Sequence, residues 1–390
     1  MLKKKILFTG WYPNPVEKYK NVFFQNLIFA IADLGITCTV ISPVSYMRYR
    51  NKINLIPKVT EHITPAGNKI RVFYPRVFSA SSKQIGVYNT EKLTEKWFEN
   101  GAIRIAKQLK KSGESFDAVY GHFFLYGGLA AIKIGRLLNI SSYVAFGECD
   151  YESQVQKTYG NLSKKDIEGL TGVISVSTKN AKKLDELGIF SNIPVIIAPN
   201  AVNQNLFKKM DKKKCRIELD LPEDKYIVGF VGGFIERKGD KRLLDAINQM
   251  DDVYVAFAGA PGNGNAKPAG ERVLFCRPLE HEQVPVLLNA IDVFCLPTLS
   301  EGSCNAVAEA MSCGVPVISS NLSFNDDVLT DDNSIRINPC SVDEIKSAIL
   351  LIKNDDKKVN HILNNAKKKS EELKIENRAK KIIEFIYRNI

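Results

Sequence analysis

Two acidic residues eight positions apart, Glu301 and Glu309, are the pair in this sequence best suited to chemistry. They flank the start of a helix expected over residues 305–313, which Ser303 or Asn305 is expected to cap. Free N–H groups at such a helix start favour a diphosphate. If the whole stretch were helical, the acids would lie ~12 Å apart along one face. They would then hold the two ends of one extended ligand, a sugar and a ribose, with the diphosphate between them.

The elements that must position these acids are apolar, strand-like runs alternating with helix-like segments. Strands that are apolar on both faces and separated by helices indicate parallel sheets. The first series has strands at residues 6–9, 37–42, 118–120, 143–146, 173–176 and 194–198, and helices at 21–34, 127–138 and 178–187. The second has strands at 227–231, 253–257, 293–296 and 316–319, and helices at 241–250, 281–290 and 305–313. The pattern predicts an α/β protein with two Rossmann-like, doubly wound parallel-sheet domains facing across a cleft.

Composition narrows the possible partners. The chain of 390 residues has eight scattered cysteines, no C-x-x-C and four histidines, so neither a disulfide framework nor a zinc site is expected. Residues 1–190 carry a net charge of +12 and residues 191–390 a net charge of −1. The basic half suits an anionic membrane surface. Its densest aromatic and basic stretch, 46–78, is either part of such a surface or a solvated surface with a few strands. No nucleic-acid motif accompanies the charge, so no nucleic-acid partner is expected.

Missing motifs exclude other classes. No G-x-G-x-x-G follows a strand and no phosphate-binding P-loop occurs, which argues against a dehydrogenase and a P-loop NTPase. The apolar stretch near the N-terminus covers only residues 6–8, and the apolar segment 22–44 is interrupted by polar residues. We therefore expect a cytoplasmic protein, either free or peripheral on the cytosolic face of the membrane.

The stretch E-G-S-C-N-A-V-A-E-A-M-S-C-G-V-P-V-I-S resembles, nearly residue for residue, the E-x7-E signature of the retaining GT-B glycosyltransferases of family GT4, group 1. Residues 230–239 resemble the family's strand-loop-helix with a phosphate-binding lysine, which is Lys238 here. The family often has Arg where this chain has Gly233, and Arg237 is the candidate substitute. The resemblance spans nearly the whole chain and is weakest over residues 46–110.

The resemblance implies that the two domains bind different substrates. Residues 1–202, completed by a helix at 373–390, form the acceptor-binding domain, and residues 203–372 form the donor-binding domain. The family often has a His near the reacting centre where this chain has Phe146. Glu148 is a candidate to supply the missing polar contact, or it is a helix-capping acid. His122 aligns with a family His and is either a site residue or a structural one.

The activity implied by the resemblance is transfer of a sugar, with retention, from a nucleotide-diphosphate sugar such as a UDP- or GDP-sugar. The acceptor would be a saccharide, in particular a lipid-linked one used in cell-envelope polysaccharide synthesis. No cofactor is expected, and no metal, since no family-like D-x-D motif is present. The catalytic candidates are Glu301, Lys238, Glu148 and His122. The donor-binding candidates are Gly233, Arg237, Lys238, Gly302, Ser303, Cys304, Asn305 and Glu309.

Two other interpretations stay open at this point. A GT-B-type nucleotide-sugar epimerase would release free sugar or an isomer without an acceptor. A degenerate, non-catalytic nucleotide-sugar-binding or membrane-scaffold protein would not consume the donor. The missing family His and the Gly233 departure are the two features that count, slightly, toward the second of these.

Overall fold

The chain forms two compact units in the computed structural model, which describes residues 4–80, 83–86, 88–262 and 264–390. One unit comprises residues 1–198 and 376–390, and the other residues 199–375. The limits expected from sequence, 202/203 and 372/373, lie a few residues away. The difference arises because the Val202 N–H donates to the Leu373 carbonyl at 2.8 Å, and the Ile375 N–H donates to the Val202 carbonyl at 3.0 Å. These bonds hold both ends of the second unit together.

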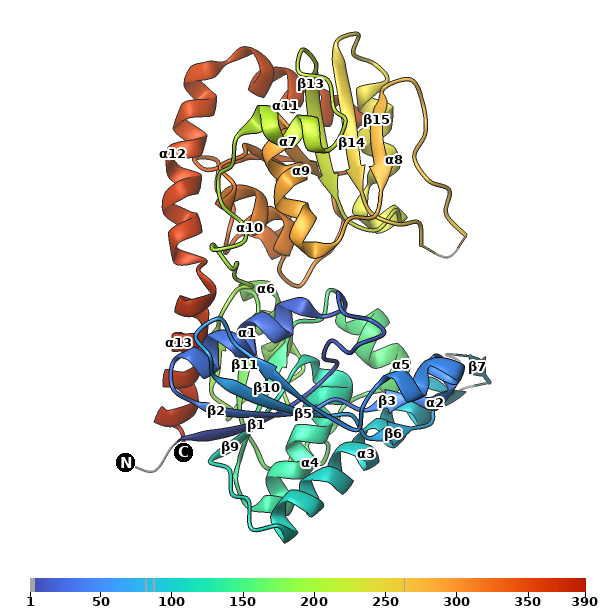
Figure 1. Ribbon diagram of the computed structural model, residues 1–390, viewed down its shortest axis with the longest axis vertical. Helices are drawn as coiled ribbons and strands as arrows, with labels where there is room; N and C mark the ends of the chain where they lie inside the picture. Colours follow the sequence, from blue (N-terminus) through green and yellow to red (C-terminus); the bar gives the residue numbers. More distant parts are fainter. Residues whose placement is uncertain (1–3, 81–82, 87, 263) are drawn as a thin grey trace. The chain divides into compact units, whose positions relative to one another are not determined.

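The first unit is built on an eight-stranded sheet (Figure 1). Neighbouring strands are parallel except for the edge pair β5 and β4, which is antiparallel. In spatial order the strands are β12 (Val195–Ile197), β11 (Leu170–Ser175), β10 (Ser141–Phe146), β9 (Ala118–Gly121), β1 (Lys5–Thr9), β2 (Thr37–Ile41), β5 (Lys69–Phe73) and β4 (Val59–Ile63). Short pairs join β3 (Val44–Ser45) to β6 (Arg76–Val77) and β7 (Gln84–Ile85) to β8 (Tyr88–Asn89).

Helices pack on this sheet and enclose its apolar strands. They are α1 (Val22–Asp33), α2 (Tyr46–Tyr49), α3 (Glu91–Lys111), α4 (Leu129–Leu138), α5 (Lys157–Tyr159), α6 (Thr178–Glu186) and α13 (Ile375–Arg388), with short irregular turns η1 (Arg50–Leu55), η2 (Phe123–Gly128) and η3 (Glu152–Gln156). The terminal helix α13 docks where β11 has Gly172, because a Cβ there would lie 2.8 Å from the Phe385 ring. The Tyr143 hydroxyl also donates to the Ile386 carbonyl at 3.0 Å. Residues distant in sequence thus complete the first unit.

The second unit is a six-stranded, wholly parallel sheet with one continuous apolar core. Its strands, in spatial order, are β15 (Val273–Arg277), β14 (Val253–Ala258), β13 (Tyr226–Val231), β16 (Val293–Leu296), β17 (Val317–Ser320) and β18 (Ile335–Ile337). Its helices are α7 (Lys212–Glu218), α8 (Asp240–Ile247), α9 (Val284–Ala290), α10 (Asn305–Ser312), α11 (Val342–Asn354) and α12 (Asp356–Glu372), with turns η4 (Glu236–Lys238), η5 (His281–Gln283) and η6 (Ser323–Asn325).

The predicted fold class, α/β with two Rossmann-like parallel-sheet units, is confirmed. The strand order around β13 and β16 reverses direction along the sheet, so the loops after these two strands lie at a topological switch point. Ligands in open α/β sheets bind at such points, beyond the carboxyl ends of the strands. Among the residues described, no helix combines the length and the apolar character needed to cross a membrane.

Candidate active site

A cluster of opposite charges follows β13 and β16 in the second unit. Glu301 is 6% exposed, and its Oε1 lies 2.6 Å from Lys238 Nζ and 2.8 Å from Arg237 Nη1. The Thr298 hydroxyl donates to the same oxygen at 2.9 Å. Burial disfavours the ammonium form of Lys238, but the adjacent carboxylate outweighs that cost and raises its pKa. Two cations and one carboxylate therefore form a compact group with a net positive charge.

The turn η4 carries Arg237 and Lys238 from the end of β13 to the start of α8. It is fixed to the loop after β16 because the Leu299 N–H donates to the Arg237 carbonyl at 2.7 Å. Gly239, which follows, has φ +81°, and a Cβ there would lie 2.5 Å from the Pro297 carbonyl oxygen. Only glycine combines this backbone conformation with so close an approach. The backbone itself therefore sets where Lys238 points.

The start of α10 differs from the expected capping. Ser303 and Asn305 do not cap the helix; Cys304 occupies the N-cap position and makes no side-chain cap bond. The Ser303 hydroxyl instead accepts from the Asn200 N–H at 3.0 Å, and Asn200 Nδ2 donates to the Ser303 carbonyl at 3.1 Å. Asn305 Oδ1 is buried and has no partner among the described residues. Because Cys304 makes no side-chain cap bond, the first N–H groups of α10 stay candidates for binding an anion.

Cys304 itself is not a reactive thiol. It is buried, and burial raises the pKa of its thiol to about 12 despite the neighbouring Lys238 ammonium. The protonated thiol contributes packing and a backbone position rather than charge. Gly302 precedes it in the loop.

Gly233 lies in the loop after β13, and a Cβ there would have as its nearest neighbour the Ala260 carbonyl oxygen, at 3.8 Å. That distance is ordinary contact, so packing does not exclude a side chain at Gly233.

Glu309 lies in the second turn of α10 and its side chain is 14% exposed. The spacing of eight residues does not run along one helix, because residues 301–304 precede α10. The Glu309 Oε1 lies 3.8 Å from His281 Nε2, and the His281 ring packs against Phe207 with centroids 5.2 Å apart. His281 was not a sequence candidate, and no motif singles it out. The structure thus gives the two acids separate neighbours, basic for Glu301 and imidazole for Glu309.

The sequence candidates of the first unit are Glu148 and His122. Glu148 follows β10, is 6% exposed, and accepts from the Phe124 N–H at 2.6 Å and the Gly147 N–H at 3.0 Å. Burial raises the pKa of this carboxyl to about 7, although the N–H donors act in the opposite direction. Phe146, the residue in the place of the family His, is buried and packs against Phe124. Glu148 is therefore a buried carboxyl with a pKa near neutral, and its bond from Phe124, at the start of η2, is the kind a helix-capping acid makes.

The pKa of Glu148 predicts a pH dependence of stability. The folded pKa is raised, so the folded state binds more protons than the unfolded state, whose value is 4.5. Stability is highest below that value and falls as pH rises toward about 7. The expected loss is on the order of 3 kcal/mol. Glu148→Gln should remove this loss. Urea unfolding of the variant and the wild type at pH 5 and pH 8 measures it, and equal pH dependence in both would contradict the burial of a titrating Glu148.

His122 follows β9 and is 5% exposed. Its ring stacks on Phe24, with centroids 4.3 Å apart and planes at 25°, and meets Phe123 edge-on. Burial, together with the nearby Arg378 guanidinium, lowers its pKa to about 3. The imidazole is therefore uncharged at neutral pH and held by aromatic packing. Its assignment as a catalytic group stays a prediction.

The second unit matches a known family. Residues 211–369 fit the family model described as glycosyl transferases group 1. Residues 211–369 therefore belong to the group 1 glycosyltransferases, and the fold of the chain is of the GT-B type. The match covers η4, α8 and α10 and with them Arg237, Lys238, Glu301 and Glu309, so the charged cluster lies within the shared region of this glycosyltransferase.

Two curated relatives cover different shares of the chain. TuaC of Bacillus subtilis (strain 168), a glycosyltransferase whose name assigns it to teichuronic acid biosynthesis, is 23% identical over 358 residues, 88% of each chain. A D-inositol 3-phosphate glycosyltransferase of Mycobacterium bovis (strain BCG / Pasteur 1173P2) is 31% identical over 243 residues. That match covers 57% of this glycosyltransferase and half of the mycobacterial protein.

Solved structures share the fold over nearly the whole chain. Sucrose-phosphate synthase from Thermosynechococcus elongatus has a TM-score of 0.78 at 20% identity, covering 99% of this chain and 98% of that one. Anabaena Alr3699/HepE in complex with UDP has a TM-score of 0.70 at 16% identity, covering 98% and 100%. At these identities the likeness concerns the GT-B fold alone.

Proposed function

We propose that this group 1 glycosyltransferase is a retaining enzyme of family GT4 that transfers a sugar from a UDP- or GDP-sugar to a saccharide acceptor. The observation that carries the proposal is the pair of cations, Lys238 and Arg237, gathered on Glu301 beside the uncapped start of α10. A nucleotide-sugar donor also has support from Alr3699/HepE, whose structures contain UDP and UDP-glucose.

The proposed roles follow from the charge that develops during transfer. The bond from the anomeric carbon to the diphosphate breaks, and negative charge grows on the leaving nucleoside diphosphate. Fixed cations and N–H dipoles stabilise that charge most when they are placed before the reaction. Lys238, Arg237 and the N–H groups from Gly302 to Asn305 have this role in our proposal. At Gly233 only backbone atoms are available to the donor, because this chain lacks the basic side chain that the family often has there.

The two acids and the first unit complete the proposed assignment. Glu301 orients the donor sugar through its hydroxyls, and Glu309 accepts from the ribose hydroxyls. Glu148 and His122 belong to the acceptor-binding unit, with Glu148 as the proton-exchanging candidate because of its pKa of about 7. No cofactor or metal ion takes part in this proposal. Among the described residues there is no group of His, Cys, Asp and Glu arranged to hold a metal ion.

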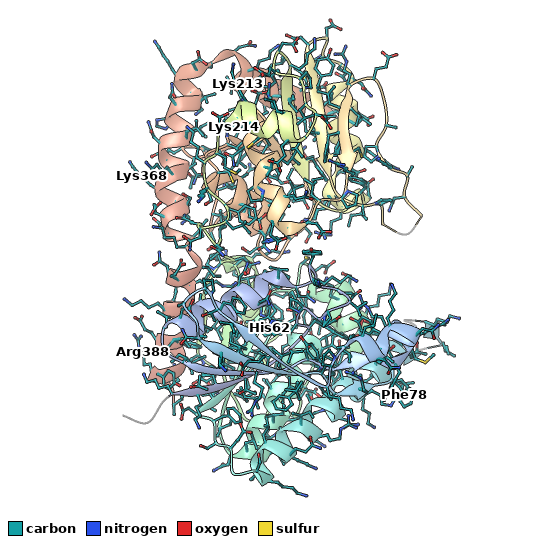
Figure 2. The ribbon with its side chains drawn as sticks, in the orientation of Figure 1. His62, Phe78, Lys213, Lys214, Lys368 and Arg388 are labelled. Atoms are coloured by element: carbon teal, nitrogen blue, oxygen red, sulfur yellow. The ribbon has the colours of Figure 1, made fainter. Side chains whose placement is uncertain are left out.

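We place the acceptor in cell-envelope polysaccharide synthesis, as a lipid-linked saccharide at the cytosolic face of the membrane. The name of TuaC supports the first part of this assignment. The second part rests on an exposed group of side chains in the first unit, here called the basic-aromatic patch: Tyr46, Met47, Arg50, Lys52 and Phe78. The Tyr46 and Phe78 rings lie 5.8 Å apart, and Figure 2 shows Phe78 at the margin of the unit. Aromatic and basic side chains together suit an anionic lipid surface.

Product analysis tests the proposed reaction. Incubation with UDP-glucose or a GDP-sugar and a saccharide acceptor should give a nucleoside diphosphate and a new glycosidic bond in the donor's anomeric configuration. An inverted product would contradict retention. An isomerised sugar formed without an acceptor would indicate an epimerase instead, and an unconsumed donor across all acceptors would indicate a non-catalytic binding protein.

Sedimentation with liposomes tests the membrane assignment. Each Lys or Arg near an anionic surface contributes about 1 kcal/mol, so Arg50→Ala with Lys52→Ala should weaken binding roughly 30-fold. The matched control, Lys107→Ala with Lys111→Ala, removes the same charge from exposed positions of α3. Binding that ignores salt and anionic lipid, or that both double variants weaken equally, would contradict the basic-aromatic patch as the docking surface.

A further inference from the structure

The first unit contains a pocket of about 230 Å³ that none of the roles above uses. It lies beyond the carboxyl ends of β1 and β2, where open α/β sheets bind ligands. This volume is below the roughly 300–1,000 Å³ of sites for drug-sized ligands, and it suits a single sugar ring. The lining residues that matter here are Trp11, Asn14, Glu17, Lys20, Arg48 and Tyr49.

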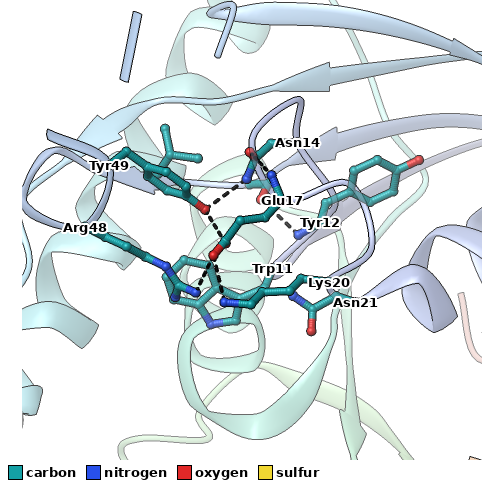
Figure 3. Close-up of a pocket in the computed structure, with 10 residues that line it drawn as sticks. Trp11, Tyr12, Asn14, Glu17, Lys20, Asn21, Arg48 and Tyr49 are labelled. Atoms are coloured by element: carbon teal, nitrogen blue, oxygen red, sulfur yellow. Dashed lines mark hydrogen bonds and ion pairs between the residues drawn. The ribbon is translucent and has the colours of Figure 1, made fainter. Parts of the chain in front are cut away.

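Three side chains converge on Glu17 in this pocket (Figure 3). Its Oε1 lies 2.7 Å from Lys20 Nζ and 2.9 Å from Arg48 Nη2, and its Oε2 accepts from the Tyr49 hydroxyl at 2.7 Å. Burial disfavours the carboxylate, but these hydrogen bonds outweigh it and hold the pKa of Glu17 below its ordinary value. Glu17 is therefore charged and fixes the position of both cations.

Hydrogen bonds hold the polar wall of the pocket in place. Asn14 is 6% exposed, and its Nδ2 donates to the Tyr49 hydroxyl at 2.9 Å. The short helix α2 that carries Arg48 and Tyr49 is capped by Ser45, whose hydroxyl accepts from the Arg48 N–H at 3.1 Å. The Arg48 guanidinium also lies 5.8 Å from the Tyr49 ring centroid. Preorganised groups of this kind lose little conformational entropy when a ligand binds.

Trp11 supplies the aromatic surface that a sugar site also needs. Its indole is half-buried and packs against the rings of Phe98 and Tyr126, with centroids 5.0 Å and 5.3 Å away. These contacts fix the orientation of the indole. Polar side chains that fix orientation, set beside an aromatic wall, are the usual composition of a small-molecule site.

The charge of the pocket selects among sugars. Lys20 and Arg48 outnumber Glu17, so the charged groups that line the pocket sum to one positive charge. Glu17 accepts a hydrogen bond only from Nη2 of Arg48. A guanidinium has five N–H donors, so the others can form a bidentate contact with a carboxylate or phosphate group. Side-chain exposures of 58% for Lys20 and 44% for Arg48 leave both cations accessible to a ligand.

We infer that this pocket binds the acceptor through a sugar that carries a negative charge, a uronate or a phosphorylated hexose, with Arg48 and Lys20 as the specificity-determining residues. The inference rests on the proposed glycosyl transfer and names the acceptor class for it. The same helix α2 carries Tyr46 and Met47 of the basic-aromatic patch, so one short element links acceptor selection to the docking surface.

Ligand-observed NMR titrations of the full chain test this inference. Methyl β-D-glucuronide and glucose 6-phosphate are the anionic probes, and methyl β-D-glucoside is the neutral one. At least one anionic probe should bind roughly tenfold or more tightly than the glucoside. Arg48→Ala should abolish the preference and Lys20→Ala should weaken it. Lys18→Ala, in the same loop but outside the pocket, should leave it unchanged. The stronger of the two anionic probes identifies the acceptor's anion.

Equal binding of all three probes, no binding at millimolar concentration, or an unchanged preference in Arg48→Ala would each overturn the inference. If Arg48→Ala fails to fold, the preference for anionic probes is measured in Lys20→Ala, and an unchanged preference there overturns the inference. A thermal shift with UDP, GDP or ADP separates this outcome from the proposed function, because nucleotide binding belongs to the second unit. A nucleotide shift without glucuronide or phosphate selectivity would reject the acceptor class and leave glycosyl transfer intact.

Discussion

Replacement of Lys238 by alanine should lower donor turnover by about 10²–10³-fold, the usual cost of removing one preorganised donor to a developing negative charge. The side chain is 16% exposed and is held 2.6 Å from Glu301. Glu301 keeps hydrogen bonds from Arg237 and Thr298 in the variant, so the fold should persist. The loss should therefore appear in turnover rather than in folding.

The measurement for Lys238→Ala is the initial rate of nucleoside diphosphate release from the donor, with circular dichroism to verify folding. Lys241→Ala is the matched control, because it removes the same charge from an exposed position in the first turn of α8. The control should keep wild-type turnover. A Lys238→Ala rate within a few-fold of the wild-type rate would remove this side chain from the proposed mechanism.

Glu301→Gln should lower the stability of the protein, and the loss should be smaller when a nucleoside diphosphate is bound. The wild-type carboxylate compensates two cations, Lys238 and Arg237, in a largely buried setting. Removing one member of a buried ion pair typically costs about 3–5 kcal/mol of folding stability. Because Arg237 is partly exposed, we expect Glu301→Gln to cost about 3 kcal/mol or less. A bound diphosphate supplies the missing negative charge. The variant should therefore unfold more easily when empty and gain more stability from a nucleoside diphosphate than the wild type does.

Thermal unfolding with and without UDP or GDP measures the effect of Glu301→Gln. Glu309→Gln is the comparison variant, because the Glu309 carboxylate lies 3.8 Å from the His281 ring rather than between two cations, so its neutralisation should cost less stability. Equal nucleotide-induced shifts in Glu301→Gln and the wild type would mean that the diphosphate does not sit against Lys238 and Arg237.

Four of the six strands of the second unit could be predicted from sequence because they are mostly buried and read as apolar runs, whereas the partly buried edge strands β15 and β18 could not. The strand expected over 293–296 is β16, and the helix expected over 305–313 differs from α10 by one residue. The Glu301 and Lys238 neighbourhood follows from the same elements, since loops after adjacent parallel strands meet at one sheet edge. The contact between His281 and Glu309 was not predictable, because no local pattern links a residue before α9 to one in α10.

The first unit was less predictable between residues 46 and 110. The long helix α3 was not identified because Glu95 and Glu99, one turn apart, occupy core-facing positions and interrupt its apolar stripe. Glu95 is retained there by a hydrogen bond from the Tyr126 N–H, and Glu99 by an ion pair with Lys133. The antiparallel edge β4–β5 also departs from the expected all-parallel sheet.

The pocket around Glu17 could not be found from sequence for a different reason. Its groups come from the loop after β1 and from α2, which lie more than twenty residues apart, and no motif links the two segments. The neutral state of His122 likewise depends on its burial in the folded unit and, to a smaller extent, on Arg378, which the terminal helix α13 contributes. Tertiary packing, rather than local pattern, determines both.

The central claim is that the cluster of Lys238 and Arg237 on Glu301, with Glu309 in α10, holds a nucleotide-diphosphate sugar. The most direct measurement is a thermal-shift titration of the wild type, Lys238→Ala and Glu309→Ala with UDP-, GDP- and ADP-sugars. A donor at 100 times its Kd stabilises the protein by about 2.7 kcal/mol. We expect at least one donor to raise the wild-type Tm and both variants to lose that rise. Undiminished shifts in both variants, or no shift with any nucleotide sugar, would contradict the account.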